Sequence, residues 1–343
     1  MRRCFVLATL CAACILLPAC VVHAAPSDFI PGIIAAHSFP PAGTLEDRVG
    51  TAPQAVLDYF AEFDKNQIPE DKPYRAHTPT TAERAEIASV IGKLPDAFRK
   101  AMTPCLAGIY FIDNMIGSGW TEWFIGPDRR EYYIIALNSE VLSLNASQWL
   151  TKKEKSAFVA DDPAYDIRID IGTDVSGFYY VFFHEAAHVF DYIGDITPGE
   201  PGMESAKRYA KIMALGLRTD TGYPFPATCW KAFSEPRTKY DFPGRMAVTF
   251  YGLNGGPYLK ISAALSLYEF LEKSPFATLY GAQNWMEDFA EMFAVVMSVD
   301  ELHRPWKLTV TKNGKSIYEI DNPLKRHSVA PRVTLMKKLI SNN

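Results

Sequence analysis

The sequence predicts an α+β fold, because its strand-like segments come first and its helical segments follow. Residues 106–137 contain three short segments with an apolar period of two, whereas residues after 176 have mainly helical spacing. The 343 residues are 48% hydrophobic and 22% charged, which is typical of globular proteins and excludes a disordered, collagenous or coiled-coil chain. A chain of this length suggests about two units of ~150 residues.

The charge balance is nearly even. Lys and Arg number 35 against 39 Asp and Glu, so the formal net charge is -4. Nucleic-acid-binding proteins usually carry an excess of basic residues that forms a patch or stripe. We therefore predict no nucleic-acid partner.

Residues 1–24 have the three parts of a secretory signal peptide. Residues 1–3 are basic at two positions, residues 4–22 are almost entirely apolar, and residues 22–24 (Val-His-Ala) resemble a cleavage site. Cleavage after Ala24 would give a secreted or periplasmic protein. No later apolar run approaches ~18 residues, so we predict no integral membrane association after removal of the signal.

Two alternatives remain for this segment. The apolar run is just long enough to span a bilayer as an anchor, although Pro18 and the small residues at its end favour cleavage. Residues 17–20 (Leu-Pro-Ala-Cys) resemble a lipobox, in which Cys20 would carry a lipid anchor. Pro18 fits that motif poorly.

Residues 25–94 are predicted to form an N-terminal linker and helical extension. Residues 26–53 are rich in Pro, Gly and Ala, and Gln54 to Lys65 has helical spacing. Thr80 and Glu83 form a capping-box pattern that begins a helix ending at Leu94.

Residues 95–343 would form the second unit. Its predicted elements are the strands Leu106–Ile112, Thr121–Ile125, Glu131–Leu137 and Tyr165–Ile171, and the helices Ser147–Phe158, Ser176–Gly194, Tyr258–Glu272 and Trp285–Val299. An irregular insertion at about 198–257 contains one predicted helix, Glu204 to Leu217. Asn313-Gly314 lies between alternating residues near the end of the chain, which predicts a β-hairpin over 308–320.

The segment most indicative of chemistry is His184-Glu185-Ala186-Ala187-His188. Histidines four residues apart share one helix face, so both imidazoles can bind one zinc ion at ~2.0–2.1 Å. Glu185 would lie beside the open position of the metal and act as the base for a zinc-bound water. The alternative, a solvated surface helix, fits poorly because apolar residues surround the motif.

A catalytic zinc site normally has three protein ligands. The metzincin spacing is excluded, because Asp191 and Gly194 occupy the positions that would need Gly and His. Glu287 on the helix that begins near Trp285 is the best candidate for the third ligand. Its alternative role is helix capping, since Asn284 precedes it by three residues.

Two carboxylates compete to orient a ligand histidine. Glu291 lies one turn after Glu287, and Asp191 lies three residues after His188. We favour Glu291. Outside the signal segment the only cysteines are Cys105 and Cys229, for which export predicts a disulfide, with two separate thiols as the alternative.

The two helical motifs resemble those of a known group. The His-Glu-x-x-His helix, Glu287-Asp-Phe-Ala-Glu291 and a tyrosine seven residues before Glu287 are similar to gluzincins related to anthrax lethal factor and to the Pro-Pro endopeptidases. The resemblance implies that Glu287 is the third zinc ligand and that Tyr280 stabilises the transition state. It also implies a zincin-like fold, in which a small mixed sheet with an edge strand and the active-site helix precede a mainly helical lower part. The chain departs from lethal factor in its long insertion, which we expect to shape the substrate cleft.

We therefore predict an exported zinc metalloendopeptidase that hydrolyses peptides or proteins with one zinc ion per chain. Strand Tyr132 to Leu137 is a candidate edge for pairing with an extended substrate, or else an ordinary core strand. The alternatives for function are a zinc amidase acting on cell-wall peptides and a catalytically silent metal-binding module. Glu185 argues against the silent module, because a structural zinc site needs no base.

Overall fold

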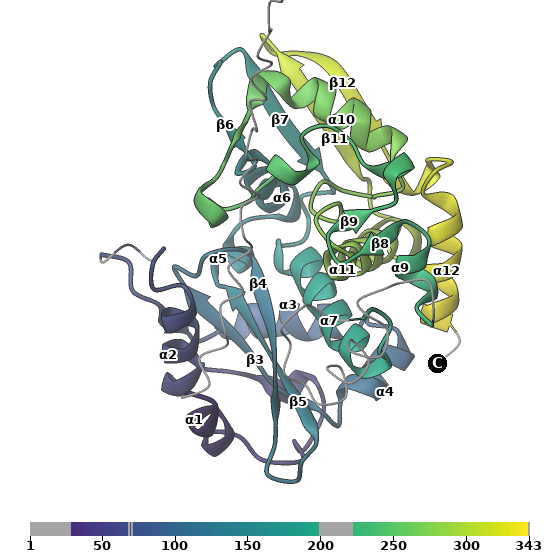
Figure 1. Ribbon diagram of the computed structural model, residues 1–343. Helices are drawn as coiled ribbons and strands as arrows, with labels where there is room; N and C mark the ends of the chain where they lie inside the picture. The colour runs from purple at the N-terminus through teal and green to yellow at the C-terminus, as the bar shows by residue number, and fades with distance from the viewer. Residues whose placement is uncertain (1–28, 68, 70, 199–221, 342–343) are drawn as a thin grey trace, which may run out of the picture.

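The computed structural model describes residues 29–67, 69, 71–198 and 222–341, and it has the predicted α+β character, with small sheets and many helices (Figure 1). The predicted signal segment with Cys20 and the predicted helix Glu204 to Leu217 lie outside the described residues. Among the helices that are described, none is long and apolar enough to cross a membrane.

The larger sheet has the strand order β1-β3-β5-β4, and β2 also pairs with β3. Strand β5 is parallel to β3, and β4 is antiparallel to β5. These strands are β1 (Val49–Gly50), β2 (Arg75–His77), β3 (Leu106–Asp113), β4 (Gly119–Ile125) and β5 (Glu131–Asn138). The three longer strands lie where the period-two segments predict them.

The edge of this sheet differs from the prediction. The segment Tyr132 to Leu137 belongs to β5, which is paired on both sides, and β4 beyond it is one of the edge strands of the described sheet. The physical reason is visible in the burial: every residue from Tyr132 to Asn138 is buried, as expected for an interior strand with a near-continuous apolar run. Among the described strands, β4 and not β5 forms this edge of the sheet.

The side chains of β5 alternate between two cores, one on each face of the sheet. Tyr132, Ile134 and Ala136 pack in the core that includes α2 (Gln54–Phe63), near α1 (Ile30–Ala35). The intervening residues pack in the larger core, which contains α7 (Phe178–Gly194). Figure 1 shows α1 and α2 on one side of the sheet and α7 on the other.

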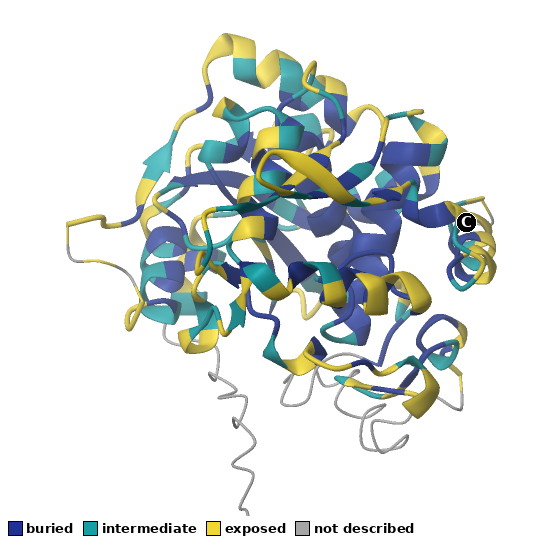
Figure 2. Ribbon diagram, turned by 90° about the horizontal axis from the view of Figure 1, so that it is seen from above, coloured by how far each residue is buried: buried dark blue, intermediate teal, exposed yellow. Residues whose placement is uncertain are grey.

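Helices α7 and α11 (Trp285–Val296) pack against each other in the centre of the molecule, where Figure 2 shows mostly buried chain. The other α-helices in the described residues are α3 (Thr81–Ile91), α4 (Asp96–Met102), α5 (Glu140–Ser143), α6 (Ala146–Lys155), α9 (Pro224–Ala227), α10 (Ala264–Lys273) and α12 (Ala330–Ser341). Helix α3 begins with the predicted capping box of Thr80 and Glu83.

A second sheet lies at the other end of the molecule (Figure 1). It has the order β12-β11-β7, formed by β7 (Tyr165–Asp170), β11 (Lys307–Lys312) and β12 (Lys315–Asp321). Asn313 and Gly314 both have positive φ, at 52° and 73°. This is the backbone that a tight hairpin turn requires, and the predicted hairpin is confirmed.

Short strands complete the fold. They are β6 (Phe158–Val159) with β10 (Leu259–Lys260), and β8 (Trp230–Ala232) with β9 (Glu235–Pro236). The prediction of one helix from Tyr258 to Glu272 is wrong in its first part, because Leu259–Lys260 pairs with β6 and α10 begins only at Ala264. Pairing with a distant strand overrides the local helical spacing there.

A buried ion pair joins α12 to α11. The Asp288 carboxylate accepts hydrogen bonds from Arg332 Nη1 at 3.0 Å and from Trp230 Nε1 at 2.7 Å. The Asp288 and Arg332 side chains are 1% and 2% exposed. Asp288 therefore faces away from solvent and fixes three segments of the chain to one another.

Arg332→Met should lower the free energy of unfolding by ~3–5 kcal/mol, because it leaves the Asp288 carboxylate buried without its cation. Urea denaturation followed by circular dichroism measures the change. Arg168→Met is the matched control: the Arg168 side chain is 74% exposed and pairs with Asp166 at the surface, so its loss should cost at most ~1 kcal/mol. Equal effects of the two substitutions would contradict the role given to the buried pair.

Candidate metal centre

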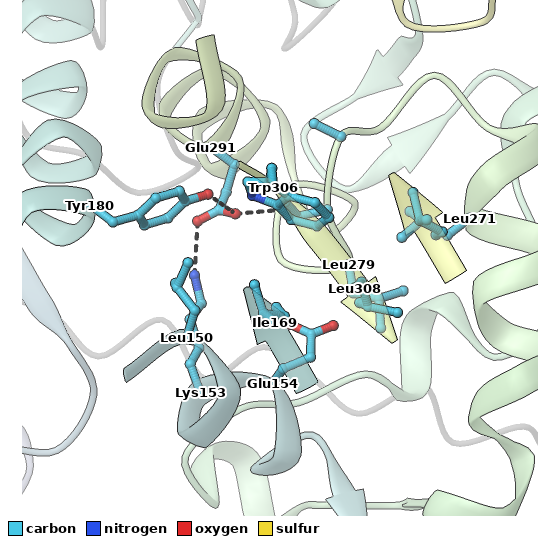
Figure 3. Close-up of a pocket in the computed structure, with 13 residues that line it drawn as sticks. Leu150, Lys153, Glu154, Ile169, Tyr180, Leu271, Leu279, Glu291, Trp306 and Leu308 are labelled. Carbon is cyan, nitrogen blue, oxygen red and sulfur yellow. Dashed lines mark hydrogen bonds and ion pairs between the residues drawn. The ribbon is translucent and has the colours of Figure 1, made fainter. Parts of the chain in front are cut away.

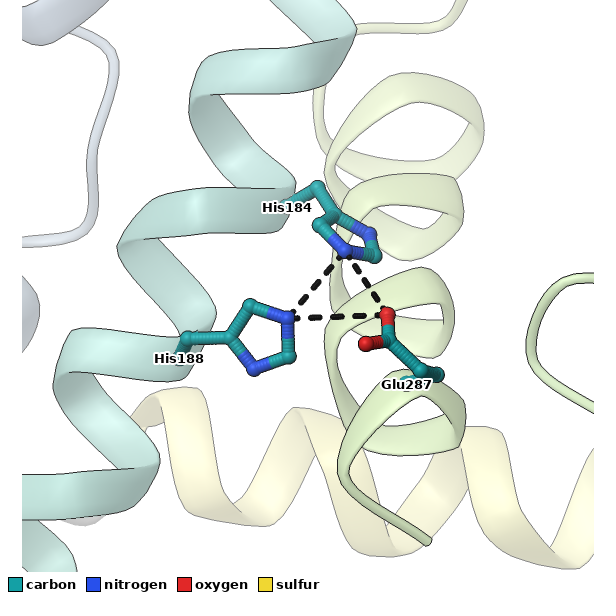
Figure 4. A group of neighbouring side chains, drawn as sticks. All are labelled: His184, His188 and Glu287. Carbon is teal, nitrogen blue, oxygen red and sulfur yellow. Dashed lines mark hydrogen bonds and ion pairs between the residues drawn. The ribbon is translucent and has the colours of Figure 1, made fainter. Parts of the chain in front are cut away.

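Helix α7 is apolar on nearly every side and buried from Phe178 to Tyr192, as expected for a helix in a protein core. His184 and His188 are one turn apart and point to the same side, toward α11 (Figure 4). Glu287 projects from the first turn of α11 to meet them. Two helices that are distant in the sequence thus bring three polar side chains together in the interior.

The three side chains converge on one point. His184 Nε2 lies 3.2 Å from His188 Nε2, and Glu287 Oε2 lies 3.1 Å from the first nitrogen and 3.6 Å from the second. Donors at ~2.0–2.1 Å from a tetrahedral metal ion would be about 3.3–3.4 Å apart. Glu287 Oε2 is buried, and apart from its ion-pair contacts with the two histidines it accepts no hydrogen bond from the part of the chain that the structure describes. This buried His-His-Glu group fits a metal ion.

The pKa shifts of His184 and Glu287 also support a site for a metal ion. Burial by itself would lower the pKa of His184, but the carboxylates of Glu287 and Glu291 outweigh burial and raise that pKa to about 9. Burial would raise the pKa of Glu287, and the two histidines reverse this and hold it far below its usual range. These charges favour a positive charge beside the Glu287 carboxylate, which is where a cation would bind.

The alternative capping role of Glu287 does not match the structure. Asn284 is the N-cap residue of α11, and its side-chain oxygen accepts hydrogen bonds from Met286 N and Glu287 N at 3.0 Å. The Glu287 carboxylate instead faces the histidines. Asn284 caps the helix end, so the Glu287 side chain is not needed there and contacts the histidines.

Glu291, and not Asp191, is the carboxylate beside His184. Glu291 Oε1 lies 3.1 Å from His184 Nδ1, and its side chain is 2% exposed. The Asp191 carboxylate accepts hydrogen bonds from Thr197 N at 2.6 Å and Thr197 Oγ1 at 2.7 Å. Asp191 thus ties the end of α7 to the following loop.

The sheet fixes Glu185 from the other side. Thr121 Oγ1 on β4 lies 2.8 Å from Glu185 Oε2, to which it donates, and 3.0 Å from the Glu185 carbonyl oxygen. A Cβ atom at Gly119 would lie 2.9 Å from Glu185 Oε1, so glycine permits this close approach of β4. Burial raises the pKa of Glu185, although both histidines oppose the shift. A carboxylate with a raised pKa is a better proton acceptor.

The Tyr280 ring lies beside His184. Its ring centroid is 5.6 Å from that of His184 and 5.0 Å from that of Phe250, which packs edge-on. Burial, followed by the charge of Glu287, raises the pKa of Tyr280 well above its usual range. The hydroxyl therefore stays protonated and can donate a hydrogen bond.

The two cysteines do not form the predicted disulfide and are free thiols. Cys105 follows α4 and directs its thiol to the carbonyl oxygens of Ala101 and Met102. Cys229 is buried beside Asp288, with Sγ 3.5 Å from Oδ2. Each thiol therefore contacts its own, different neighbours.

Two residues near the centre have no signal in the sequence. Thr121 lies on the edge strand β4 and contacts Glu185. Lys153 lies on α6 and contacts Glu291, but its sequence does not distinguish it from the other polar residues of that helix, Gln148, Lys152 and Lys155. Only the tertiary packing brings either of them to the site.

Comparison with protein-family models, curated proteins and solved structures finds no match for this chain.

Proposed function

We propose that this protein is a zinc-dependent metallopeptidase that uses Glu185 as its general base. The observation that carries the proposal is the convergence of His184 Nε2, His188 Nε2 and Glu287 Oε2 in a buried group, with Glu185 on the same helix. Two histidines and a glutamate are a donor set typical of catalytic zinc. A purely structural site would be expected to have four protein ligands and no adjacent base.

His184, His188 and Glu287 would hold the zinc ion, which when bound lowers the pKa of water and polarises a carbonyl group. Glu185 accepts the proton of the attacking water and then delivers it to the leaving amine. Thr121 keeps the Glu185 carboxylate in place through its hydrogen bond at 2.8 Å. Tyr280 donates a hydrogen bond to the oxyanion that forms on the substrate carbonyl.

An extended peptide would bind along β4. This strand forms one edge of the sheet among the described residues, and Thr121 on it contacts the general base directly. Addition of a peptide strand to such an edge is a common mode of recognition. The position of the edge strand β4 beside the buried helix α7, which carries both histidines, supports a zincin-like fold for this chain.

Mass spectrometry of a proteome-derived peptide library tests this function. The zinc-loaded protein should generate new amino termini within linear peptides, and chelation of the metal should stop this. Isolated cell-wall peptides with their amide cross-links serve as the second substrate set. Release of products from that set alone would favour the zinc amidase, and turnover of neither set would leave a metal-binding module in place of an enzyme.

Tyr280→Phe should lower kcat by ~10²–10³, the range for loss of one oxyanion donor. The ring and its contacts with His184 and Phe250 remain, so zinc content and fold should not change. KM should move little, because the hydroxyl binds a charge that exists only in the transition state. Steady-state kinetics together with zinc analysis measures these effects. A kcat within about threefold of wild type, far short of that range, would show that Tyr280 is only structural.

A further inference from the structure

Helix α6 carries a lysine that is almost entirely buried. The Lys153 side chain is 9% exposed, whereas its neighbours Lys152 and Lys155 are 51% and 42% exposed at the surface. Lysine is rarely buried unless its ammonium group is paired. The position of Lys153 in the interior therefore needs an explanation in terms of its partners.

The first partner is Glu291. Lys153 Nζ lies 2.8 Å from Glu291 Oε1, the same oxygen that lies 3.1 Å from His184 Nδ1. The other carboxylate oxygen accepts hydrogen bonds from Tyr180 at 3.0 Å and from Thr278 at 2.6 Å. Figure 3 shows Lys153 and Tyr180 meeting the carboxylate from different sides. Lys153 thus supplies the positive charge that fixes the oxygen facing the ligand histidine.

The second partner is Tyr280. Lys153 Nζ lies 4.0 Å from the centroid of the Tyr280 ring, well within the range of a cation–π interaction. Phe250 packs edge-on against the same ring, and His184 flanks it. One ammonium group therefore contacts both the carboxylate behind a ligand and the ring of the proposed oxyanion donor.

We infer that Lys153 is a positioning residue that aligns two parts of the centre, the His184 imidazole through Glu291 and the Tyr280 ring by direct contact. The inference rests on the proposed function for the role of Tyr280, whereas its metal-binding part does not. It differs from a simple counter-ion role, in which Lys153 would balance the charge of Glu291 and have no separate influence on Tyr280.

Lys153→Met in the full chain should weaken zinc affinity ~10–100-fold, as is typical when the partner of a ligand histidine is disturbed. It should also lower kcat by about 10²-fold, because displacement of a reacting group by about 1 Å has effects of that size. Competition with a chromophoric zinc chelator measures the affinity. Lys152→Met on the same helix is the matched control, since that side chain is exposed and pairs with Glu140, and it should change neither quantity.

A Glu291→Gln background separates the effect of Lys153 on zinc affinity from its effect on Tyr280. It also removes the Glu291 carboxylate, which in Lys153→Met alone would be buried without a cation and could prevent folding. Adding Lys153→Met there should leave zinc affinity within about threefold of Glu291→Gln, because Lys153 acts on the metal only through that carboxylate. The same addition should still lower kcat, since the contact with Tyr280 is independent of Glu291. In the Tyr280→Phe background the hydroxyl is gone, so Lys153→Met should lower the kcat of the zinc-loaded protein much less than it does in the wild type.

Three results would overturn the inference. They are a further loss of zinc affinity in the Glu291→Gln background, an unchanged kcat in that background, and wild-type zinc affinity and kcat in a folded Lys153→Met protein. If the zinc-loaded wild type cleaves no peptide, the peptidase proposal and the Tyr280 part fail together. Zinc affinity still decides the Glu291 part in that case, so the two failures are distinguishable.

Discussion

Glu287→Ala should deprive the protein of zinc at concentrations that saturate the wild type. The substitution leaves two histidines where a catalytic zinc site normally has three protein ligands. The effect should exceed the ~10–100-fold loss typical of residues that only support a ligand. Zinc content after dialysis against a weak chelator, with affinity from competition titration, measures it.

Glu291→Gln and Asp191→Asn are the matched controls for that measurement. Glu291 touches His184 Nδ1, so its loss should stay within the range for a supporting residue. Asp191 binds Thr197 and should leave zinc affinity close to that of the wild type. If either control loses zinc more severely than Glu287→Ala, Glu287 is not the third ligand.

Glu185→Gln should lower kcat by ~10²–10⁴, the contribution of a positioned general base, while the protein still holds one zinc ion per chain. Glutamine has nearly the same shape and can still accept the hydrogen bond from Thr121 Oγ1. It cannot take the proton of the attacking water. Single-turnover kinetics on a cleaved peptide, with zinc analysis of the same sample, separates loss of the base from loss of the metal.

Thr121→Ser is the control for Glu185→Gln, since it retains the hydroxyl that holds the carboxylate. Its kcat should stay near the wild-type value. Loss of zinc from Glu185→Gln would make Glu185 a ligand, and an unchanged kcat with zinc bound would assign the base to another group.

Local patterns in the sequence predict the parts of the fold that depend on short-range physics. The hairpin at Asn313-Gly314 follows from turn residues that tolerate positive φ, and the helix at Thr80 follows from its capping box. Spacing predicts that His184 and His188 share a helix face. Each of these features requires only residues that are near one another along the chain.

Local patterns in the sequence do not predict which distant segments pair or pack together. The apolar run of β5 is compatible with an edge or an interior position, and only the pairing of β4 along its side makes it interior. Leu259 has helical spacing but pairs with Phe158. The sequence around Lys153 is that of a surface lysine on an amphipathic helix, and its burial depends on contacts with the distant residues Glu291 and Tyr280.

The most direct test of the account is anomalous diffraction at the zinc absorption edge from crystals of the zinc-loaded protein. We expect one strong peak per chain, ~2.0–2.1 Å from His184 Nε2, His188 Nε2 and a Glu287 carboxylate oxygen. A chain without a peak between α7 and α11, or with its zinc bound elsewhere, would contradict it.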